Sequence, residues 1–371
     1  MVNPSIQAIG TANPPHKISQ EKHYAILESA NGLNREEKLR MKMIYSRSGI
    51  KYRHSVLQEF DGGDEPENLI FHPAGEVSAP ISVRMNVYEE HASSLCLQAA
   101  NECFEMLPNL KKEEITHLIA FSCTGMYAPG LDVQMVQQLG LQRSVERTCI
   151  NFMGCYAAIN ALKTAYHISR SEPDAVVMLV GVELCSLHYQ KSADQNQMLA
   201  NALFSDGAAV SIVSCRKLAK DASFPSLRLE SFYSEFDHSG VEEMVWRIGD
   251  AAFDLRLSPE VPNLVKGNIA GMVSKLLHKA GLKQIDIDYY AIHPGGVKIL
   301  EACEKELGIT KEDNEISYEV LSNYGNMSSV TILFVLSEYM KRLSADYPGK
   351  KIMACAFGPG LTIESMIIET C

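Results

Sequence analysis

Short apolar runs rich in β-branched residues recur along this chain and alternate with segments of helical periodicity. The runs cover residues 115–123, 175–181, 208–214, 287–293 and 351–358. Continuous apolar runs of this length suit strands that are buried on both faces. Between them, apolar residues recur at helical spacing over residues 155–169, 261–280, 297–307 and 327–343. The alternation predicts an α/β fold in which helices cover mixed sheets.

The chain is long enough for two large halves. It has 371 residues, and single hydrophobic cores stop growing at roughly 250–300 residues. The stretch 215–225 is polar, mixed in charge and contains a proline. We therefore predict an N-terminal half at residues 1–217 and a C-terminal half at residues 224–371. The acidic segment 61–80, with several glycines and prolines, is interpreted as a surface loop.

Charge and cysteine usage exclude several classes of protein. With 34 basic and 45 acidic residues, the net charge of -11 argues against binding to nucleic acid or to anionic membranes, which needs a basic surface. No run reaches the roughly 18 apolar residues of a membrane span. Ten cysteines are scattered without a CxxC pair, which argues against structural zinc. Because the N-terminus lacks a signal-like pattern, we expect a reducing, cytoplasmic location.

Cys155 is the first candidate for chemistry. In NFMGCYAA it stands between a strand-like stretch and the helical segment 155–169. A sulfur near a helix N-terminus meets unpaired N–H groups and the positive end of the helix dipole, which lower the pKa of a thiol. The alternative is a buried cysteine with a purely structural role.

His293 and Asn326 are the second and third candidates. His293 ends a buried strand and precedes Pro294, Gly295 and Gly296, so a ligand can approach the backbone there and the imidazole is placed for proton transfer. A hydrogen-bonded structural histidine is the alternative. His72 has a similar local pattern, but no strand precedes it and we rank it far lower.

Asn326 precedes a long apolar-faced helix, where it can cap the helix or donate its amide to a developing oxyanion. A cysteine, a histidine and an asparagine together suit condensation chemistry. The thiolate takes up an acyl group, and the other two hold a thioester oxygen while the extender loses carbon dioxide and becomes an enolate.

At this point the motifs resemble a known family. NFMGCYAA, AIHPGG, SNYGNMSS and AFGPGLTIE, in this order and at these separations, are similar to those of the type III polyketide synthases, the chalcone and stilbene synthase-like family. The resemblance extends from IGTANPP at residues 9–15 to the GPG loop at residues 358–360. It implies a thiolase-type fold, in which two related halves form a five-layered αβαβα core, usually as a homodimer.

The resemblance also implies a reaction. Cys155, His293 and Asn326 would be the catalytic triad, with an acyl-CoA starter and malonyl-CoA as extender. The family requires no metal and no acyl carrier protein, and coenzyme A enters as part of the substrates rather than as a cofactor.

Further residues carry over from the family. Phe204 matches a phenylalanine that separates the coenzyme A tunnel from the cavity, with plain core packing as the alternative. The second aromatic of this gate falls at Phe253 or Leu255. Coenzyme A phosphates would meet a basic helix, for which a solvated basic face is the alternative. The candidates there are Arg40, Lys42 and Arg47.

The cavity departs from the plant pattern. Cys123 stands where plant enzymes often carry threonine, and Ala128 stands at the place that usually reaches across the dimer interface. These stretches look like those of bacterial members, and small residues could make room for a fatty acyl starter instead of a cinnamoyl one. Cys123 could be a second reactive thiol, with a buried hydrophobe as the alternative. The other expected cavity residues are Cys185, His188, Ser328, Gly358 and Pro359.

We therefore expect repeated decarboxylative condensation that ends in a pyrone or a resorcinol-type ring. One alternative is a single-round condensing enzyme, such as a β-ketoacyl-ACP synthase of the third class or a hydroxymethylglutaryl-CoA synthase. The other is a thiolase-fold scaffold that binds acyl-CoA without turnover.

Overall fold

The computed structural model describes residues 3–30, 32–61, 70, 79–218, 224–345 and 348–371. Most of the loop predicted at residues 61–80, including His72, lies outside the described residues. So do residues 219–223, which border the predicted divide between the halves, and the boundary at 217 and 224 stays a prediction.

The described strands include one large mixed sheet of nine. From edge to edge it runs through β11 (Tyr289–Ile292), β12 (Lys351–Gly358), β13 (Thr362–Thr370), β8 (Leu227–Phe236), β1 (Ser5–Ala12), β7 (Asp206–Ser214), β6 (Val176–Leu184), β4 (His117–Ser122) and β5 (Glu146–Asn151). A short antiparallel pairing, with Ser5 opposite Arg228 and Ile6 opposite Leu227, joins β1 to β8 at the centre.

The two sides of this junction repeat one topology. In β1–β7–β6–β4 the first two pairings are antiparallel and the third is parallel. In β8–β13–β12–β11 the same three pairings recur in the same order. β5 adds a further strand to the first group only, where it pairs in parallel with β4.

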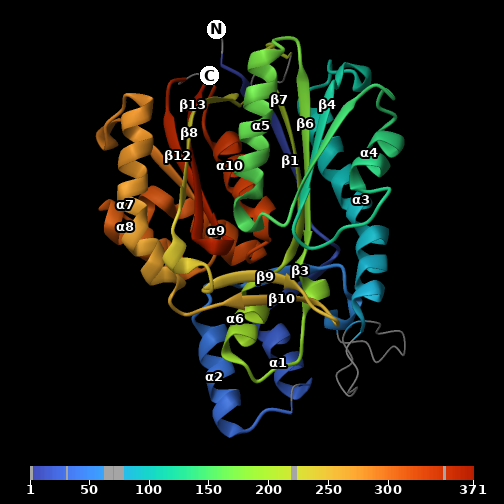
Figure 1. Cartoon of the computed structure of the whole chain (residues 1–371), viewed down its shortest axis with the longest axis vertical. Helices are drawn as coiled ribbons and strands as arrows, with labels where there is room; N and C mark the ends of the chain where they lie inside the picture. Colours follow the sequence, from blue (N-terminus) through green and yellow to red (C-terminus); the bar gives the residue numbers. More distant parts are fainter. Residues whose placement is uncertain (1–2, 31, 62–69, 71–78, 219–223, 346–347) are drawn as a thin grey trace.

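Helices and strands form five layers, as Figure 1 shows. Each sheet face is covered because an uncovered apolar face would remain in water. The outer layers are α3 (Ile81–Met106) with α4 (Leu131–Leu139), and α7 (Val261–Ala280) with α8 (Val297–Leu307). Between the two groups of strands lie α5 (Ala157–Ser171) and α10 (Thr331–Arg342). This is the predicted αβαβα arrangement, and the prediction of a thiolase-type fold is confirmed.

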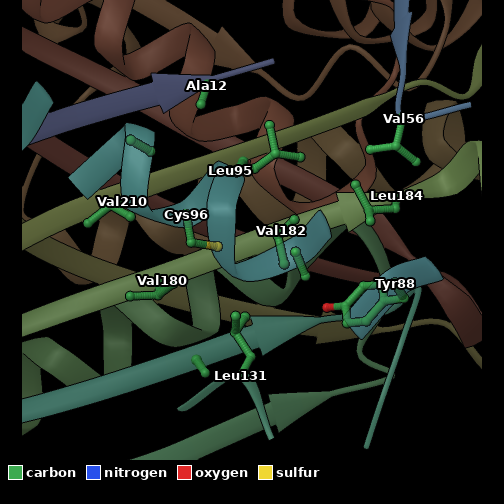
Figure 2. Packing of buried hydrophobic residues seen from close by; sticks show 14 of the residues in the cluster. Ala12, Val56, Tyr88, Leu95, Cys96, Leu131, Val180, Val182, Leu184 and Val210 are labelled. Carbon is green, nitrogen blue, oxygen red and sulfur yellow. The ribbon is translucent and has the colours of Figure 1, made fainter. Parts of the chain in front are cut away.

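Within one strand, alternating residues pack into different hydrophobic clusters. In β6, Val180 and Val182 pack toward α3, as Figure 2 shows, whereas Val177 and Leu179 belong to the cluster around α5 and α10. In β12 the same alternation divides the central cluster from the one beneath α7. Burial on both faces explains why these strands read as unbroken apolar runs.

A smaller group of elements lies beyond one end of the sheet, in the lower part of Figure 1. It contains α1 (Gln20–Ala30), α2 (Arg35–Ser46), α6 (Gln195–Leu203), the pair β2 (His16–Ser19) and β3 (Tyr52–Ser55), and the hairpin of β9 (Met244–Ile248) and β10 (Phe253–Leu257). α9 (Glu315–Tyr324) lies between α8 and α10 in the chain and packs against α10 and β3.

Buried Arg53 ties the elements of this group to one another. Its guanidinium donates to the carbonyls of Asn201, Ala202 and Phe204 at the end of α6, and to the side-chain oxygen of Gln20. A cation at a helix C-terminus compensates the negative end of the helix dipole. The end of α6, and with it Phe204, is therefore held in place.

The predicted helices at 261–280 and 297–307 match α7 and α8 residue for residue. The segments 155–169 and 327–343 open with 3-10 turns, η3 (Gly154–Tyr156) and η8 (Ser328–Val330), before α5 and α10 begin. In the described part of the chain, every helix is too short or too polar to cross a membrane.

Candidate active site

Cys155 lies in the strained turn η3, which joins β5 to α5. Gly154 has a φ of 76°, and a β-carbon there would lie 2.1 Å from the Cδ of Pro359. Phe152 also has a positive φ, of 60°, which is unfavourable for a residue with a side chain. The turn thus holds a costly backbone conformation next to the sulfur, as is frequent at functional sites.

His293 follows β11 and is almost fully buried. Its backbone N–H donates to the carbonyl of Cys355 at 2.8 Å, and its carbonyl accepts from the N–H of Gly295 at 2.9 Å. Neither ring nitrogen has a hydrogen-bond partner among the described residues. Because buried polar atoms are nearly always paired, an imidazole held in this way is available to a ligand.

Asn326 caps the turn before α10 and directs its amide nitrogen at a carbonyl. Its side-chain oxygen accepts from the N–H of Ser328 at 2.9 Å and caps the turn that leads into α10. Its side-chain nitrogen donates to the carbonyl of Gly295 at 3.3 Å, a long bond that a better acceptor can replace. Backbone bonds to Leu203 and Ser205 fix Asn326 beside Phe204.

These three side chains meet in one cavity, which we call the catalytic chamber. It has a free volume of about 50 Å³. Its walls are mostly apolar. Besides the three, its lining includes Cys123, Cys185, Phe204, Trp246, Leu255, Ser328, Phe357 and Pro359.

Burial sets the protonation of the two titratable groups. Desolvation raises the pKa of Cys155 to about 12 and lowers the pKa of His293 to about 3. Both shifts favour neutral forms, a thiol and an imidazole. The sequence predicted a lowered pKa for Cys155 from the helix N-terminus. That prediction is wrong for this structure, because desolvation outweighs the helix end and the carboxylate of Glu183 raises the pKa further.

Glu183 is a buried acid that the sequence reasoning missed. It is the last residue but one of the apolar run VVMLVGVEL, and a lone acid in such a run is itself a signal of a special environment. Its carboxylate accepts from the backbone N–H of Cys123 at 3.0 Å and from the hydroxyls of Thr124 and Ser329. It therefore ties β6 to the turn before α10, directly behind the chamber.

Two family descriptions match the chain. "Chalcone and stilbene synthases, N-terminal domain" matches residues 3–216, and "Chalcone and stilbene synthases, C-terminal domain" matches residues 234–371. This chain is a type III polyketide synthase. The family prediction from the four motifs is confirmed.

Sequence relatives agree with this assignment. The synthase is 31% identical over 364 residues to "Alpha-pyrone synthesis polyketide synthase-like Pks18" of Mycobacterium tuberculosis, covering 98% of this chain and 90% of the relative. It is 29% identical to "Probable polyketide synthase 1" of Dictyostelium discoideum, of which it covers only 11%.

Solved structures show the same fold. PKS-I from the brown alga Ectocarpus siliculosus superimposes with a TM-score of 0.92 at 29% identity, covering 100% of this chain and 99% of that one. The C-terminal type III domain of Steely1, a type I/III hybrid from Dictyostelium, gives 0.89 at 27% identity, covering 99% of each chain.

The residues predicted for the gate divide two cavities of the synthase. Behind the catalytic chamber lies a second cavity with a free volume of about 40 Å³, which we call the rear pocket. Phe204 and Leu255 line both cavities, together with Cys185 and Trp246. Phe253 lines the rear pocket alone and stacks on His188 at 4.2 Å between ring centroids. Of the two residues considered for the second gate position, Leu255 is thus the one that borders both cavities.

A third cavity, the entrance groove, reaches the chamber from the other side. Its free volume is about 230 Å³, and it shares Leu257, Gly295 and Ile299 with the chamber. Arg40 and Arg47, both predicted to meet coenzyme A phosphates, line it. Lys42 is exposed on α2 and does not line the groove, whereas Lys298 on α8, which the sequence reasoning missed, does.

The remaining predicted residues fall into three places. Cys123 lies behind Cys155, where its sulfur accepts from the N–H of Gly154 at 3.0 Å, and burial holds its pKa well above the usual value. This favours the buried-hydrophobe interpretation of Cys123. Gly358 packs so closely on Tyr156 that a β-carbon would lie 2.5 Å from its ring. Ala128 lies on an exposed loop outside these cavities.

Proposed function

We propose that this synthase condenses malonyl-CoA repeatedly onto an acyl-CoA starter held on Cys155. One observation carries the proposal: Cys155, His293 and Asn326 line a single apolar chamber that opens to a groove bearing Arg40, Arg47 and Lys298. A cationic groove suits the phosphates of coenzyme A. An apolar chamber suits an acyl chain and strengthens the electrostatic interactions inside it.

In the first step Cys155 takes the acyl group. Its thiol gives a proton to the neutral imidazole of His293, and the thiolate attacks the thioester carbonyl of the starter. The carbon–sulfur bond to coenzyme A breaks, and the departing thiolate takes the proton back from His293. The products are acyl-Cys155 and free coenzyme A.

In the second step malonyl-CoA supplies the carbon nucleophile. Loss of carbon dioxide leaves the electron pair as an enolate, whose oxygen accepts hydrogen bonds from His293 and from the amide of Asn326. A neutral imidazole suits this donor role, because the pKa of His293 is lowered to about 3 by burial. The enolate carbon then attacks acyl-Cys155, which releases the Cys155 thiolate and a chain longer by two carbons on coenzyme A.

The starter class that we propose is a fatty acyl-CoA. Support comes from the largely apolar walls of the chamber and from the rear pocket beyond it. We further propose that the extended chain closes to a pyrone or a resorcinol-type ring. The relative named for α-pyrone synthesis supports the first of these. Our expectation that neither a metal nor a further cofactor takes part stays a prediction.

Product analysis tests the proposal. The synthase is incubated with malonyl-CoA and a graded panel of acyl-CoA starters, beside Cys155→Ala, and the products are identified by mass spectrometry. We expect multiply extended pyrones or resorcinols that disappear in the variant. Products extended only once would reassign the chain to single-round condensation, and no product with any starter would contradict the proposed function.

We also propose that two copies of the synthase form a dimer along β5. This strand is the edge of the sheet, five of its six residues are exposed, and Met126 on the neighbouring loop is 40% exposed. Unpaired sheet edges commonly associate with another chain. Light scattering should give a mass of two chains for the wild type and of one for Met126→Glu. Ile285→Glu, at an exposed site in the other half, should stay dimeric, and a dimeric Met126→Glu would contradict this interface.

A further inference from the structure

The rear pocket adjoins the chamber. It shares Cys185, Phe204, Trp246 and Leu255 with the chamber, and within the described residues no side chain lines both the rear pocket and the entrance groove. The order is therefore groove, chamber, rear pocket. A chain that grows on Cys155 while coenzyme A occupies the groove has its far end directed toward the rear pocket.

His23 places a polar group in the wall of this mainly apolar pocket. It comes from α1, is 4% exposed, and packs against the ring of Phe60 at 4.9 Å between centroids. Its Nδ1 lies 3.0 Å from the hydroxyl of Tyr45. Tyr45 itself does not line the pocket, so the edge of the His23 ring that bears Nδ1 faces away from the space.

The bond to Tyr45 determines the tautomer of His23. The hydroxyl of Tyr45 is buried, and His23 is its one hydrogen-bond partner in the described part of the chain. The hydroxyl proton is satisfied only if Tyr45 donates and Nδ1 accepts. The proton of the neutral imidazole then resides on Nε2, which has no hydrogen bond to any described residue.

Two polar side chains of the pocket wall, Arg53 and His188, are already engaged. Arg53 uses its guanidinium on the end of α6 and on Gln20. His188 donates from Nε2 to the carbonyl of Thr124 at 2.6 Å and accepts at Nδ1 from the N–H of Phe253. Burial and the charge of Arg53 lower the pKa of His23, so His23 presents an uncharged N–H donor rather than a cation.

We infer that the rear pocket binds the far end of the starter chain and that His23 donates a hydrogen bond to an uncharged oxygen on it. The substrate class is an acyl-CoA with a keto, hydroxyl or ether oxygen along its chain. This inference rests on the proposed function and deepens it, because it gives the acyl starter a polar position. A site built to hydrogen-bond a substrate discriminates against an analogue that lacks the group.

Matched starters test the inference. Straight-chain acyl-CoA starters of increasing length are compared with the same chains carrying a keto group at successive positions, and kcat/KM is measured for each pair. We expect the wild type to prefer one keto chain over its plain counterpart by about tenfold, the worth of one hydrogen bond. His23→Phe, which keeps a ring and removes both nitrogens, should bring this ratio close to one.

Two further variants separate recognition from folding. His23→Gln restores an uncharged donor and should recover part of the preference. His117→Phe changes another buried histidine, whose Nδ1 also lies beside a hydroxyl, that of Thr116 at 2.8 Å, and it lines none of the three cavities. Its ratio should equal that of the wild type. The ratio of kcat/KM for the keto starter to kcat/KM for the plain starter is measured within one preparation, so loss of folded protein does not change it.

The outcomes distinguish this inference from the proposed function. If products form but His23→Phe keeps the wild-type ratio, or if no keto chain is preferred, the inference is overturned and the proposed function stands. If no starter yields product, the proposed function fails. Calorimetric binding of the plain and keto starters to Cys155→Ala then decides the inference separately, and equal affinities would overturn it.

Discussion

The hydroxyl of Ser328 lies 3.6 Å from the sulfur of Cys155. It favours the thiolate and lowers the pKa of Cys155, whereas desolvation and Glu183 raise that pKa to about 12. Alkylation of Cys155 by iodoacetamide should therefore accelerate about tenfold per pH unit above neutrality, since the thiolate is the nucleophile. Ser328→Ala should slow alkylation roughly tenfold at each pH.

Peptide mass spectrometry can follow Cys155 with the exposed Cys371 as an internal reference. The raised pKa means that the thiol form persists until the pH approaches this value, so no plateau is expected near neutrality. A plateau near pH 7 would instead reveal a preformed thiolate and imidazolium pair, contrary to the burial of both groups.

A substitution at Gly154 tests the packing of the turn that carries Cys155. A β-carbon there meets Pro359 at 2.1 Å, so Gly154→Ala should displace Cys155 and reduce kcat at least a hundredfold, with a loss of about 1–3 kcal/mol in the free energy of unfolding. Gly140→Ala is the matched control. Gly140 has a similar φ of 70° but no atom within 4 Å, so it should lose about 1 kcal/mol and keep its activity. Equal kinetics for both variants would contradict the steric argument.

Lys298 and Lys42 allow a comparison between a basic residue that lines the groove and one that was predicted from the sequence alone. Lys298 lines the groove and Lys42 does not. Lys298→Ala should raise KM for malonyl-CoA about fivefold, the effect of one partly exposed charge contact, and should leave KM unchanged for a pantetheine thioester, which lacks the distal phosphates. Lys42→Ala should change neither value. A larger effect at Lys42 than at Lys298 would favour the sequence-based assignment.

At the scale of elements, the β9–β10 hairpin covers the chamber and is clasped at two points. Trp246 donates from its indole nitrogen to the carbonyl of Cys123 at 2.7 Å, and His188 bridges Thr124 to Phe253. Trp246→Phe should loosen this cover by about 1 kcal/mol and shift the products toward longer chains, as measured by mass spectrometry. Phe236→Leu, at an exposed site on β8, should leave the distribution unchanged. An unaltered distribution in Trp246→Phe would show that the clasp does not limit chain length.

Elements with two buried faces or a long apolar stripe could be predicted from the sequence. α7 and α8 matched residue by residue because each ends at a glycine with positive φ, Gly281 and Gly308. The hairpin strands MVWRI and FDLRL were missed because each has five residues and mixes exposed with buried positions. Strands of this length carry little periodic signal.

The candidate site likewise contains residues that could be predicted from the sequence and residues that could not. Cys155, His293 and Asn326 could be predicted because each lies in a local motif at an element boundary. Glu183, Lys298 and Trp246 act through contacts with segments far away in the sequence, such as the bond of Trp246 to Cys123. No local sequence pattern indicates such a contact. The protonation of Cys155 likewise depends on how deeply the folded chain buries its thiol.

At the scale of the whole molecule, one core joins the two sides of the sheet. The cluster around α5 and α10 contains Leu162 on the first and Leu333 on the second, with strand residues from both groups. Leu333→Ala should therefore lower the free energy of unfolding by about 2–5 kcal/mol. Because the cluster is shared, amide exchange should accelerate in β6 and in β12 together, although only one helix has changed.

Urea unfolding followed by circular dichroism and by the fluorescence of the single tryptophan, together with hydrogen exchange, measures both effects. Ile285→Ala is the control, since that side chain is 89% exposed and surface substitutions usually change stability by less than about 0.5 kcal/mol. If Leu333→Ala accelerated exchange in β12 while β6 kept its protection, the two halves would have independent cores. The catalytic chamber would then lie between two separately stable units, whereas a joint loss means that the core that stabilises both halves also holds Cys155 and Asn326 in register.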